Sequence, residues 1–279
     1  MENYNKEFRA FALSKIFEIS DKLTHVHLVS REGELKQFSD MLKFFNEKAQ
    51  VIVYPAWDCL PYSNISPRKE IITKRYSALR ALERDDKNCK IFLLSIDSVL
   101  QKIIPAQEVV ENSLCLETNQ EVVLSNLVEW LEKIGYSRQT NVYSIGEYAL
   151  RGGILDVFVP AIKYPIRLDF FGAKLEKIRT FDSSSQRTNG ILKNVNIFPV
   201  SEMIIDTKAV NTFRQNYRRV IGAVKTNDRV YNSISEKILV EGIEHWLPLF
   251  NPKLVPIFSV LKGASFSYDS DLQVMIEKK

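Results

Sequence analysis

The glycines of this sequence do not form a phosphate-binding loop. Such a loop needs glycines for close backbone approach, followed by Lys and Ser or Thr for phosphate and magnesium. No G-x-x-x-x-G-K-[ST] pattern occurs among the 279 residues. Gly152 and Gly153 are followed by Ile-Leu-Asp, which leaves no lysine to reach a phosphate, so the pair predicts a tight turn. The run LLSID ends at Asp97 with no second acid and predicts a buried strand with a capping carboxylate. We therefore expect no nucleotide cofactor.

Metal ligands and catalytic groups are equally sparse. His25 and His27 would share one face of a strand, but no Asp, Glu or Cys stands at a spacing that supplies a third ligand. They are expected to be ordinary, partly exposed histidines. The acids Asp85 and Asp86 lie in a polar stretch that predicts a solvated loop, and no G-x-S-x-G motif is present. The sequence predicts no metal site and no enzyme activity for this chain.

Composition indicates a soluble protein of the cytosol. Cys59, Cys89 and Cys115 are odd in number, widely spaced and outside any C-x-x-C pair, which disfavours a disulfide framework and fits a reducing compartment. Hydrophobic residues make up 45% and charged residues 26%, as in ordinary globular proteins. Residues 1–12 lack the apolar core of a signal peptide, and no apolar run approaches the roughly 20 residues that cross a bilayer. A cytoplasmic location without membrane attachment is expected.

The positive charge of the chain is mild but locally concentrated. The formal net charge is +4, too small by itself to indicate a nucleic-acid binder. Between residues 161 and 195 there are seven basic and three acidic side chains, which equals the surplus of the whole chain. The basic residues are Lys163, Arg167, Lys174, Lys177, Arg179, Arg187 and Lys193. Arg151 lies just upstream, so this stretch is predicted to present a basic surface.

One strand of that stretch combines charge with an aromatic ring. In residues 166–171, alternation places Arg167, Asp169 and Phe171 on one face and the three apolar residues between them on the other, which is the natural core face. An exposed arginine beside an aromatic ring is typical of interface hot spots. Two structural alternatives stay open. Arg167 could pair with Asp169 or with a neighbouring strand, which contributes about 0–1 kcal/mol on a surface, and Phe171 could belong to the core.

The elements that position these residues show two different patterns of secondary structure along the chain. Apolar runs at 25–30, 51–54 and 91–94 alternate with helical periodicity at 33–45 and 70–82, which predicts a parallel α/β layer. After about residue 105 a helix at 122–134 precedes several short strands, which predicts an antiparallel α+β domain. These strands are expected at 154–159, 166–171 and 178–181, with Gly172, Ala173 and Lys174 in a hairpin turn. A further helix is expected at about 207–219. We predict an outer domain at 1–110 and 199–279, split by an inserted domain at 111–198.

Three segments carry a resemblance to a known family. Residues 54–82 begin YPAWDCLPY and continue through SP into a helix. Residues 135–188 contain GEYALRGGILDVF, IRLDFF, IRTFD and SQRT, and residues 241–250 read EGIEHWLPLF. Together they resemble the N-terminal, UvrB-like module of Mfd-type transcription-repair coupling factors. The second segment is also similar to UvrB. The first segment and the missing phosphate loop favour the coupling factors, and Trp57, Pro61 and Tyr62 of the first segment are expected to form a packed corner.

The resemblance implies a fold and a partner. The expected fold is a degenerate helicase-like, P-loop-type parallel-sheet domain that lacks its nucleotide site and is split by an inserted α+β domain. In the family this inserted domain docks the nucleotide-excision repair protein UvrA. Arg151, Arg167 and Phe171 match positions of that surface, and Asp169 and Arg179 are expected to take part in it. The full-length family is an ATP-dependent DNA translocase that also binds RNA polymerase and DNA. This chain ends before those parts, as a fragment or a truncated gene product, so we expect its UvrA surface to be uncovered.

Three functions are therefore open at this stage. The first is a non-catalytic module that recruits UvrA to stalled transcription complexes. The second is a nucleic-acid-binding module that uses the same basic strand face, whose affinity would fall steeply with salt. The third is a helicase half-domain with a noncanonical nucleotide site, which would bind ATP. The family motifs favour the first.

Overall fold

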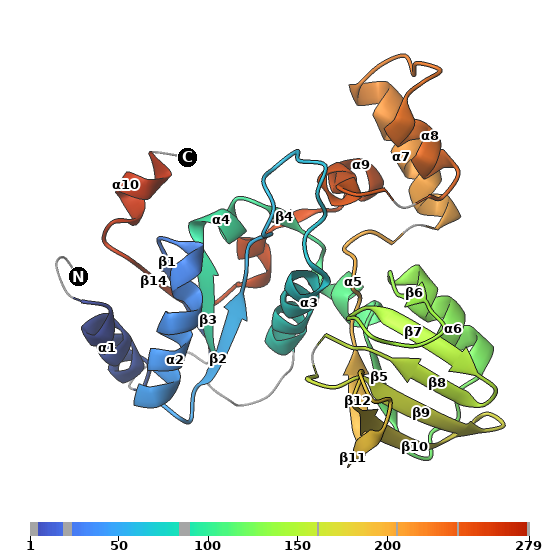
Figure 1. Ribbon diagram of the computed structural model, residues 1–279. Coiled ribbons are helices and arrows are strands. Elements are labelled where there is room, and N and C mark those ends of the chain that lie inside the picture. Colours follow the sequence, from blue (N-terminus) through green and yellow to red (C-terminus); the bar gives the residue numbers. More distant parts are fainter. Residues whose placement is uncertain are drawn as a thin grey trace. The chain divides into compact units, whose positions relative to one another are not determined.

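The computed structural model divides into two compact units, each described below by itself (Figure 1). The structure describes residues 5–18, 24–83, 90–160, 162–204, 206–238 and 240–277. Unit 1 comprises Met1–Trp57, Ser77–Ala106 and Leu254–Lys279, and unit 2 comprises Asp58–Tyr76 and Gln107–Lys253. Cys89 and the acidic pair at 85–86 lie outside the described residues. The predicted boundaries at 110 and 198 remain a prediction.

Unit 1 is built on a four-stranded parallel sheet with strand order β14-β1-β3-β2. The strands are β1 (Thr24–Val29), β2 (Gln50–Tyr54), β3 (Lys90–Ser95) and β14 (Ser265–Tyr268). β3 is buried along its whole length, as expected for an apolar run flanked by two other strands. The predicted α/β class with a parallel sheet is confirmed. The strand β14 was not predicted from the sequence.

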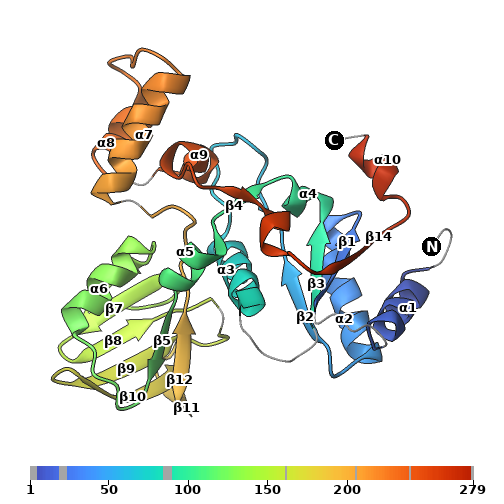
Figure 2. The same cartoon turned by 180° about the vertical axis from the view of Figure 1, so that it is seen from behind.

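Two helices cover one face of this sheet (Figure 2). They are α1 (Lys6–Glu18) and α2 (Leu35–Phe45). The α2 residues Leu35, Phe38 and Leu42 recur at intervals of three and four, so they lie on one side of the helix and are buried against Ile91 and Leu93 of β3. The amphipathic pattern thus fixes which side of α2 meets the sheet.

The remaining elements of unit 1 are short. They are η1 (Glu32–Glu34), α4 (Ile96–Val99), β4 (Lys102–Ile103), β13 (Val255–Pro256), η3 (Ile257–Val260) and α10 (Leu272–Ile276). α4 begins with a capping box in which Ser95 and Ser98 satisfy each other's backbone amides. α3 (Lys69–Glu83) contributes residues to both units.

The expectation that His25 and His27 are partly exposed was wrong. Both are about 5% exposed and lie on the β1 face that α1 and α2 cover. The ring nitrogens of His25 lie 2.7 and 2.8 Å from the hydroxyls of Ser265 and Ser267 on β14. His27 stacks on Phe38 with ring centroids 4.8 Å apart and lies 3.3 Å from Asp269. The sequence hides this because the polar partners arrive some 240 residues later.

Burial makes the stability of unit 1 depend on pH through His25. Burial, with a smaller contribution from the charge of His27, lowers the pKa of His25 from 6.5 to about 4. The unfolded chain therefore binds a proton as pH falls below 6.5, while the folded chain resists it until about pH 4. We expect the free energy of unfolding to drop by about 2 kcal/mol between pH 7.5 and pH 5 from this group alone.

Urea denaturation at both pH values tests this with His25→Asn, which retains polar atoms for the two serines. The variant should lose about 2 kcal/mol less than the wild type over that pH interval. His245→Asn serves as the matched control. Equal pH dependence in wild type and His25→Asn would contradict the prediction.

Unit 2 contains a six-stranded sheet with order β11-β10-β9-β8-β7-β6. Its strands are β6 (Ser137–Arg138), β7 (Glu147–Arg151), β8 (Ile154–Val157), β9 (Ile166–Phe171), β10 (Lys174–Phe181) and β11 (Thr188–Leu192). Neighbours from β7 to β11 run antiparallel as predicted. β6 runs parallel to β7, so the sheet is mixed. The predicted hairpin at Gly172 is confirmed.

One face of this sheet forms the core of unit 2. α6 (Leu124–Lys133) packs on it, with Leu127 and Leu131 buried against Ile166 and Leu168 of β9. A separate antiparallel pair, β5 (Leu114–Glu117) and β12 (Asn194–Ile197), contributes to the same core. α5 (Ala106–Glu111) precedes β5 in the chain. The apolar half of the alternation in β9 therefore faces inward, as predicted.

A helical subregion completes unit 2. It contains α7 (Thr207–Val220), α8 (Arg229–Ser235), η2 (Ile243–Trp246) and α9 (Leu247–Phe250). α7 and α8 lie side by side in both views (Figures 1 and 2). Phe213 and Tyr217 of α7 pack on Tyr231 of α8, and Trp246 of η2 and Phe250 of α9 complete an aromatic cluster with neighbouring ring centroids 4.6–6.1 Å apart. The cluster supplies the core that short helices need.

The first and third family-like segments meet within unit 2. Ser66 donates a hydrogen bond to Glu244 at 2.6 Å and accepts one from the amide of Gly242 at 2.9 Å. Burial raises the pKa of Glu244 above its usual value, although the bond from Ser66 opposes this. The predicted packed corner was wrong for Pro61 and Tyr62, which are both exposed. Tyr62 is 90% exposed and has a positive φ.

Candidate functional site

The outward face of the six-stranded sheet gathers the residues predicted from the sequence. We call it the polar face. It consists of Arg151, Ile154, Asp156, Arg167, Asp169, Phe171, Lys177, Arg179 and Ile191. Strand register fixes two rows across the sheet. One row runs from Asp156 through Arg167 and Arg179 to Ile191, and the other runs from Arg151 through Ile154 and Asp169 to Lys177. All five predicted site residues therefore share this face.

Arg167 is clamped rather than free. Its Nε and Nη2 atoms donate to the two carboxylate oxygens of Asp156 at 2.7 and 2.9 Å. Its guanidinium also lies 4.6 Å from the ring centroid of Phe181. The hydrogen bonds to Asp156 raise the pKa of Arg167 above its usual value, against the opposing effect of burial. A bidentate pair of this kind fixes the orientation of both side chains.

The expected solvent exposure of Arg167 was therefore wrong. The side chain is 17% exposed. Of the two pairings left open, the one with a neighbouring strand is confirmed, because the partner is Asp156 on β8 and not Asp169 on its own strand. The reason is the register of β8 against β9, which sets Asp156 directly opposite Arg167. Asp156 was missed as a site residue. An acid inside the apolar strand ILDV was the signal, since a buried carboxylate requires a cationic or hydrogen-bonding partner.

Asp169 and Arg179 form a second bidentate pair. Arg179 Nε and Nη2 donate to the Asp169 oxygens at 2.7 and 2.6 Å. Both side chains are more exposed than the Asp156–Arg167 pair, at 31% for Arg179 and 20% for Asp169. The two pairs cancel most of the charge in the centre of the polar face.

Arg151 keeps its cation accessible at the edge of these pairs. Its Nη2 donates to the side-chain oxygen of Asn141 at 2.7 Å and lies 3.8 Å from Asp156. The side chain is 51% exposed. Arg151 ends β7, and the turn at Gly152 and Gly153 follows directly. The positive φ of Gly152 and the approach of a Cβ at Gly153 to the Phe170 carbonyl, 2.7 Å, explain why glycines occupy this turn.

Large apolar side chains stand among these charges. Phe171 is 77% exposed, which excludes the alternative of a core residue, and Ile191 is 79% exposed. Ile191 lies opposite Arg179 on the outer strand β11 and was missed because 188–192 was not predicted as a strand. Exposed aromatic and aliphatic groups beside arginines make a surface suited to protein contacts rather than to bond chemistry.

Two acidic residues lie at the carboxyl ends of the parallel strands in unit 1. Glu32 follows β1, accepts from the Ala56 amide at 3.1 Å, and accepts from the Ser95 hydroxyl at the end of β3. Asp269 accepts from the Ser30 amide at 3.1 Å and pairs with Arg9. Open parallel sheets bind ligands at this edge. Here carboxylates bind the loops that a nucleotide phosphate would contact.

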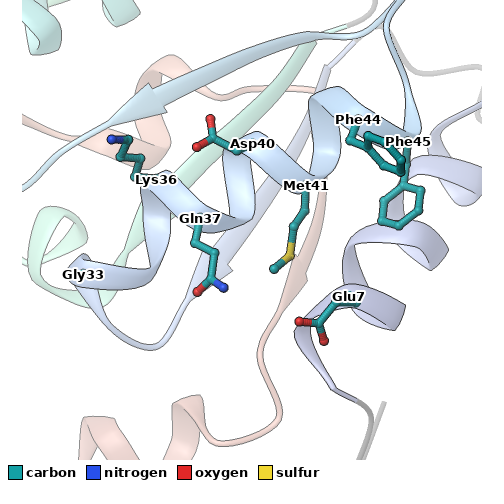
Figure 3. A pocket seen from close by; sticks show the side chains of 8 residues that line it. All are labelled: Glu7, Gly33, Lys36, Gln37, Asp40, Met41, Phe44 and Phe45. Carbon is teal, nitrogen blue, oxygen red and sulfur yellow. The ribbon is translucent and has the colours of Figure 1, made fainter.

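A shallow pocket of about 630 Å³ lies between α1 and α2 (Figure 3). Met41, Phe44 and Phe45 line its apolar part, and Glu7 on α1 faces them across the opening. No group of three or more His, Cys, Asp or Glu able to hold a metal ion occurs among the described residues. Cys59 and Cys115 are free thiols. In the part of the chain that the structure describes, no helix is long and apolar enough to cross a membrane.

Comparison with known proteins agrees with the predicted resemblance. Residues 114–203, which contain the polar face, match the family model of the UvrB interaction domain. The chain is 34% identical over 263 residues to the transcription-repair-coupling factor of Haemophilus influenzae, covering 94% of this chain and 23% of that protein. It is 30% identical to that of Escherichia coli, covering 88% and 21%. The chain thus spans less than a quarter of these relatives, and the resemblance to an N-terminal coupling-factor module is confirmed.

Proposed function

We propose, on the premise that this chain resembles the N-terminal module of transcription-repair-coupling factors, that it is a non-catalytic docking module for UvrA. The observation that supports it most is the polar face within the matched UvrB interaction domain. There Phe171 and Ile191 stand exposed around two bidentate arginine–carboxylate pairs. In the full-length relatives, the role would be to bring UvrA to RNA polymerase stalled on DNA during transcription-coupled nucleotide-excision repair.

The energetics of the polar face favour protein docking. Burying a phenylalanine side chain contributes about 1.5–3 kcal/mol, and Phe171 is free to contribute this on binding. The Asp156–Arg167 and Asp169–Arg179 pairs are already formed, so a partner meets ordered groups and little side-chain entropy is lost. Neutralisation of Arg167 and Arg179 also weakens the case for the same face as a phosphate-binding surface.

We further propose that unit 1 is a degenerate helicase-like domain interrupted by the UvrA-binding domain. The parallel order β14-β1-β3-β2 supports this, because residues 24–95 and 265–268 contribute to one sheet around the intervening segment. Glu32 at the end of β1 supports the absence of nucleotide binding, because its carboxylate would repel phosphates.

Alanine substitution at Phe171 or Arg151 tests UvrA docking. We expect each to weaken UvrA binding by at least about 2 kcal/mol, or roughly 30-fold, if they are contact hot spots. Isothermal titration calorimetry with purified UvrA measures this. Phe44→Ala is a matched control, because Phe44 is 81% exposed on α2 outside the polar face. Wild-type affinity in both Phe171→Ala and Arg151→Ala would overturn the proposal.

A further inference from the structure

A second concentration of positive charge lies outside the polar face, on the α7–α8 hairpin. Residues 207–237 contain seven basic and two acidic side chains, a surplus of +5 that exceeds the +4 of the whole chain. The sequence-based view that the surplus lies mainly in residues 161–195 was therefore incomplete. All seven basic residues of the hairpin are exposed.

The charge is confined to one side of α7. Val210, Phe213 and Tyr217 face the aromatic cluster and are buried. Arg214 and Arg218, one turn apart, border this buried row, and Asn211, Gln215 and Arg219 form a second row on the side that faces away from the cluster. Every side chain in these two rows is a hydrogen-bond donor, and α7 contains no acid.

Within the described part of unit 2, no carboxylate neutralises these cations. Arg214, Arg218 and Arg219 form no ion pair with any carboxylate in the described part of unit 2. Arginines at i and i+4 repel each other and weaken a helix slightly. A helix face that is only exposed to solvent avoids such repulsion when acidic side chains alternate with basic ones. Arg218 and Arg219 in the last turn interact favourably with the helix dipole. Lys208 and Arg214 lie outside that turn, so the dipole does not account for them.

Tyr231 on α8 holds two of the guanidinium groups in place. Arg214 Nε donates to its hydroxyl at 3.2 Å, and the guanidinium carbons of Arg214 and Arg218 lie 5.9 and 5.7 Å from its ring centroid. The hydrogen bond from Arg214 lowers the pKa of Tyr231 in spite of burial, and the charges of both arginines add to this. The cationic groups are thus ordered before any ligand arrives.

We propose that this face of α7 binds the phosphate backbone of duplex nucleic acid without sequence preference. From Lys208 to Arg219 the face extends roughly 16 Å at about 1.5 Å per residue, which matches about five base pairs of a duplex. Single-strand binders stack bases on exposed aromatic rings. Here Phe213, Tyr217 and Tyr231 are all buried, which favours a duplex backbone.

Fluorescence anisotropy of a 20-base-pair DNA duplex of arbitrary sequence, titrated with the 279-residue chain, tests the proposal. The key variant is the triple substitution Arg214→Gln, Arg218→Gln and Arg219→Gln. At 50 mM salt we expect its affinity to fall at least tenfold. The slope of log affinity against log salt should decrease by up to about 2.7, since each lost phosphate contact removes about 0.9.

The matched control removes three charges from the six-stranded sheet and the turn after it, through Lys174→Gln, Lys177→Gln and Lys193→Gln. Its affinity should stay within threefold of wild type. A wild-type chain that does not bind duplex at 50 mM salt, or a control that loses as much as the arginine variant, would overturn the inference. If circular dichroism shows that the triple variant is unfolded, the double variant Arg218→Gln/Arg219→Gln is used instead. It keeps the hydrogen bond from Arg214 to Tyr231. UvrA binding should be unchanged in these arginine variants, which separates this surface from the polar face.

Discussion

Replacing Glu202 with alanine is expected to lower the free energy of unfolding by about 3–5 kcal/mol. Glu202 follows β12 and accepts a hydrogen bond at 2.5 Å from Arg75 of α3, and both side chains are buried. The substitution would remove the carboxylate from beside a buried guanidinium, and removing one partner of a buried ion pair costs far more than the pair contributes. Thr73 of the same helix donates to the Pro199 carbonyl at 3.1 Å, so this region also anchors the backbone leading to Glu202.

Urea denaturation followed by tryptophan fluorescence measures the loss. The double variant Arg75→Met/Glu202→Leu removes both charges and should recover most of the stability lost in Glu202→Ala, because an apolar pair of similar volume satisfies a buried site. Glu236→Ala, on the exposed end of α8, serves as the control and should change stability by less than about 0.5 kcal/mol. If Glu202→Ala lowers the free energy of unfolding by less than 1 kcal/mol, the buried Arg75–Glu202 pair does not have this structural role.

Charge reversal at Arg167 is expected to destabilise unit 2 by about 3–5 kcal/mol. The new carboxylate would face the buried Asp156 in place of a bidentate partner, and the contact of the guanidinium with Phe181 would be lost. Arg151→Glu, at a side chain that is half exposed, should cost no more than about 1 kcal/mol. Thermal denaturation of the two variants in parallel measures the difference in their stability. Equal midpoints would contradict the structural role of the Asp156–Arg167 pair.

This result decides how UvrA binding is tested. A loss of binding in Arg167→Glu would report a damaged sheet as readily as a lost contact. Phe171 makes no contact with the Asp156–Arg167 pair, and Arg151 lies at its edge, 3.8 Å from Asp156. Both side chains are more than half exposed, so their alanine variants report contact more directly. We therefore treat Arg167 as a residue that positions the polar face.

The sequence predicts local patterns well and partners across strands poorly. Alternation in 166–171 correctly separated Ile166 and Leu168 from Arg167, because the period of a strand is a local property. It did not reveal Asp156 as the partner of Arg167. That pairing depends on the register between β8 and β9, which is set by the segment between them and by the packing of the whole sheet.

Long-range pairing explains the other failures. β14 was not recognised, because it has only four residues and its aromatic side chains, Phe266 and Tyr268, are exposed, while Ser265 and Ser267 face the histidines of β1. Without β14, nothing in the sequence indicated that His25 and His27 would be buried. The helices predicted at 33–45, 70–82, 122–134 and 207–219 lie close to α2, α3, α6 and α7, because their apolar period is local. The helices α1 and α8 were not predicted. The basic side of α7 emerged only when the buried aromatic cluster fixed its outward face.

The pairing of β1 with β14 also sets a timetable for biosynthesis. At roughly 5–20 residues per second, a ribosome adds Ser265 between about ten and fifty seconds after His25. Until then, one edge of β1 has unpaired backbone groups, and His25 and His27 lack the serine hydroxyls to which they later bond. Unit 2 is translated entirely within that interval, so it can fold first while the nascent parallel sheet waits for its last strand. During this interval the unpaired edge of β1 is open to mispairing with other strands.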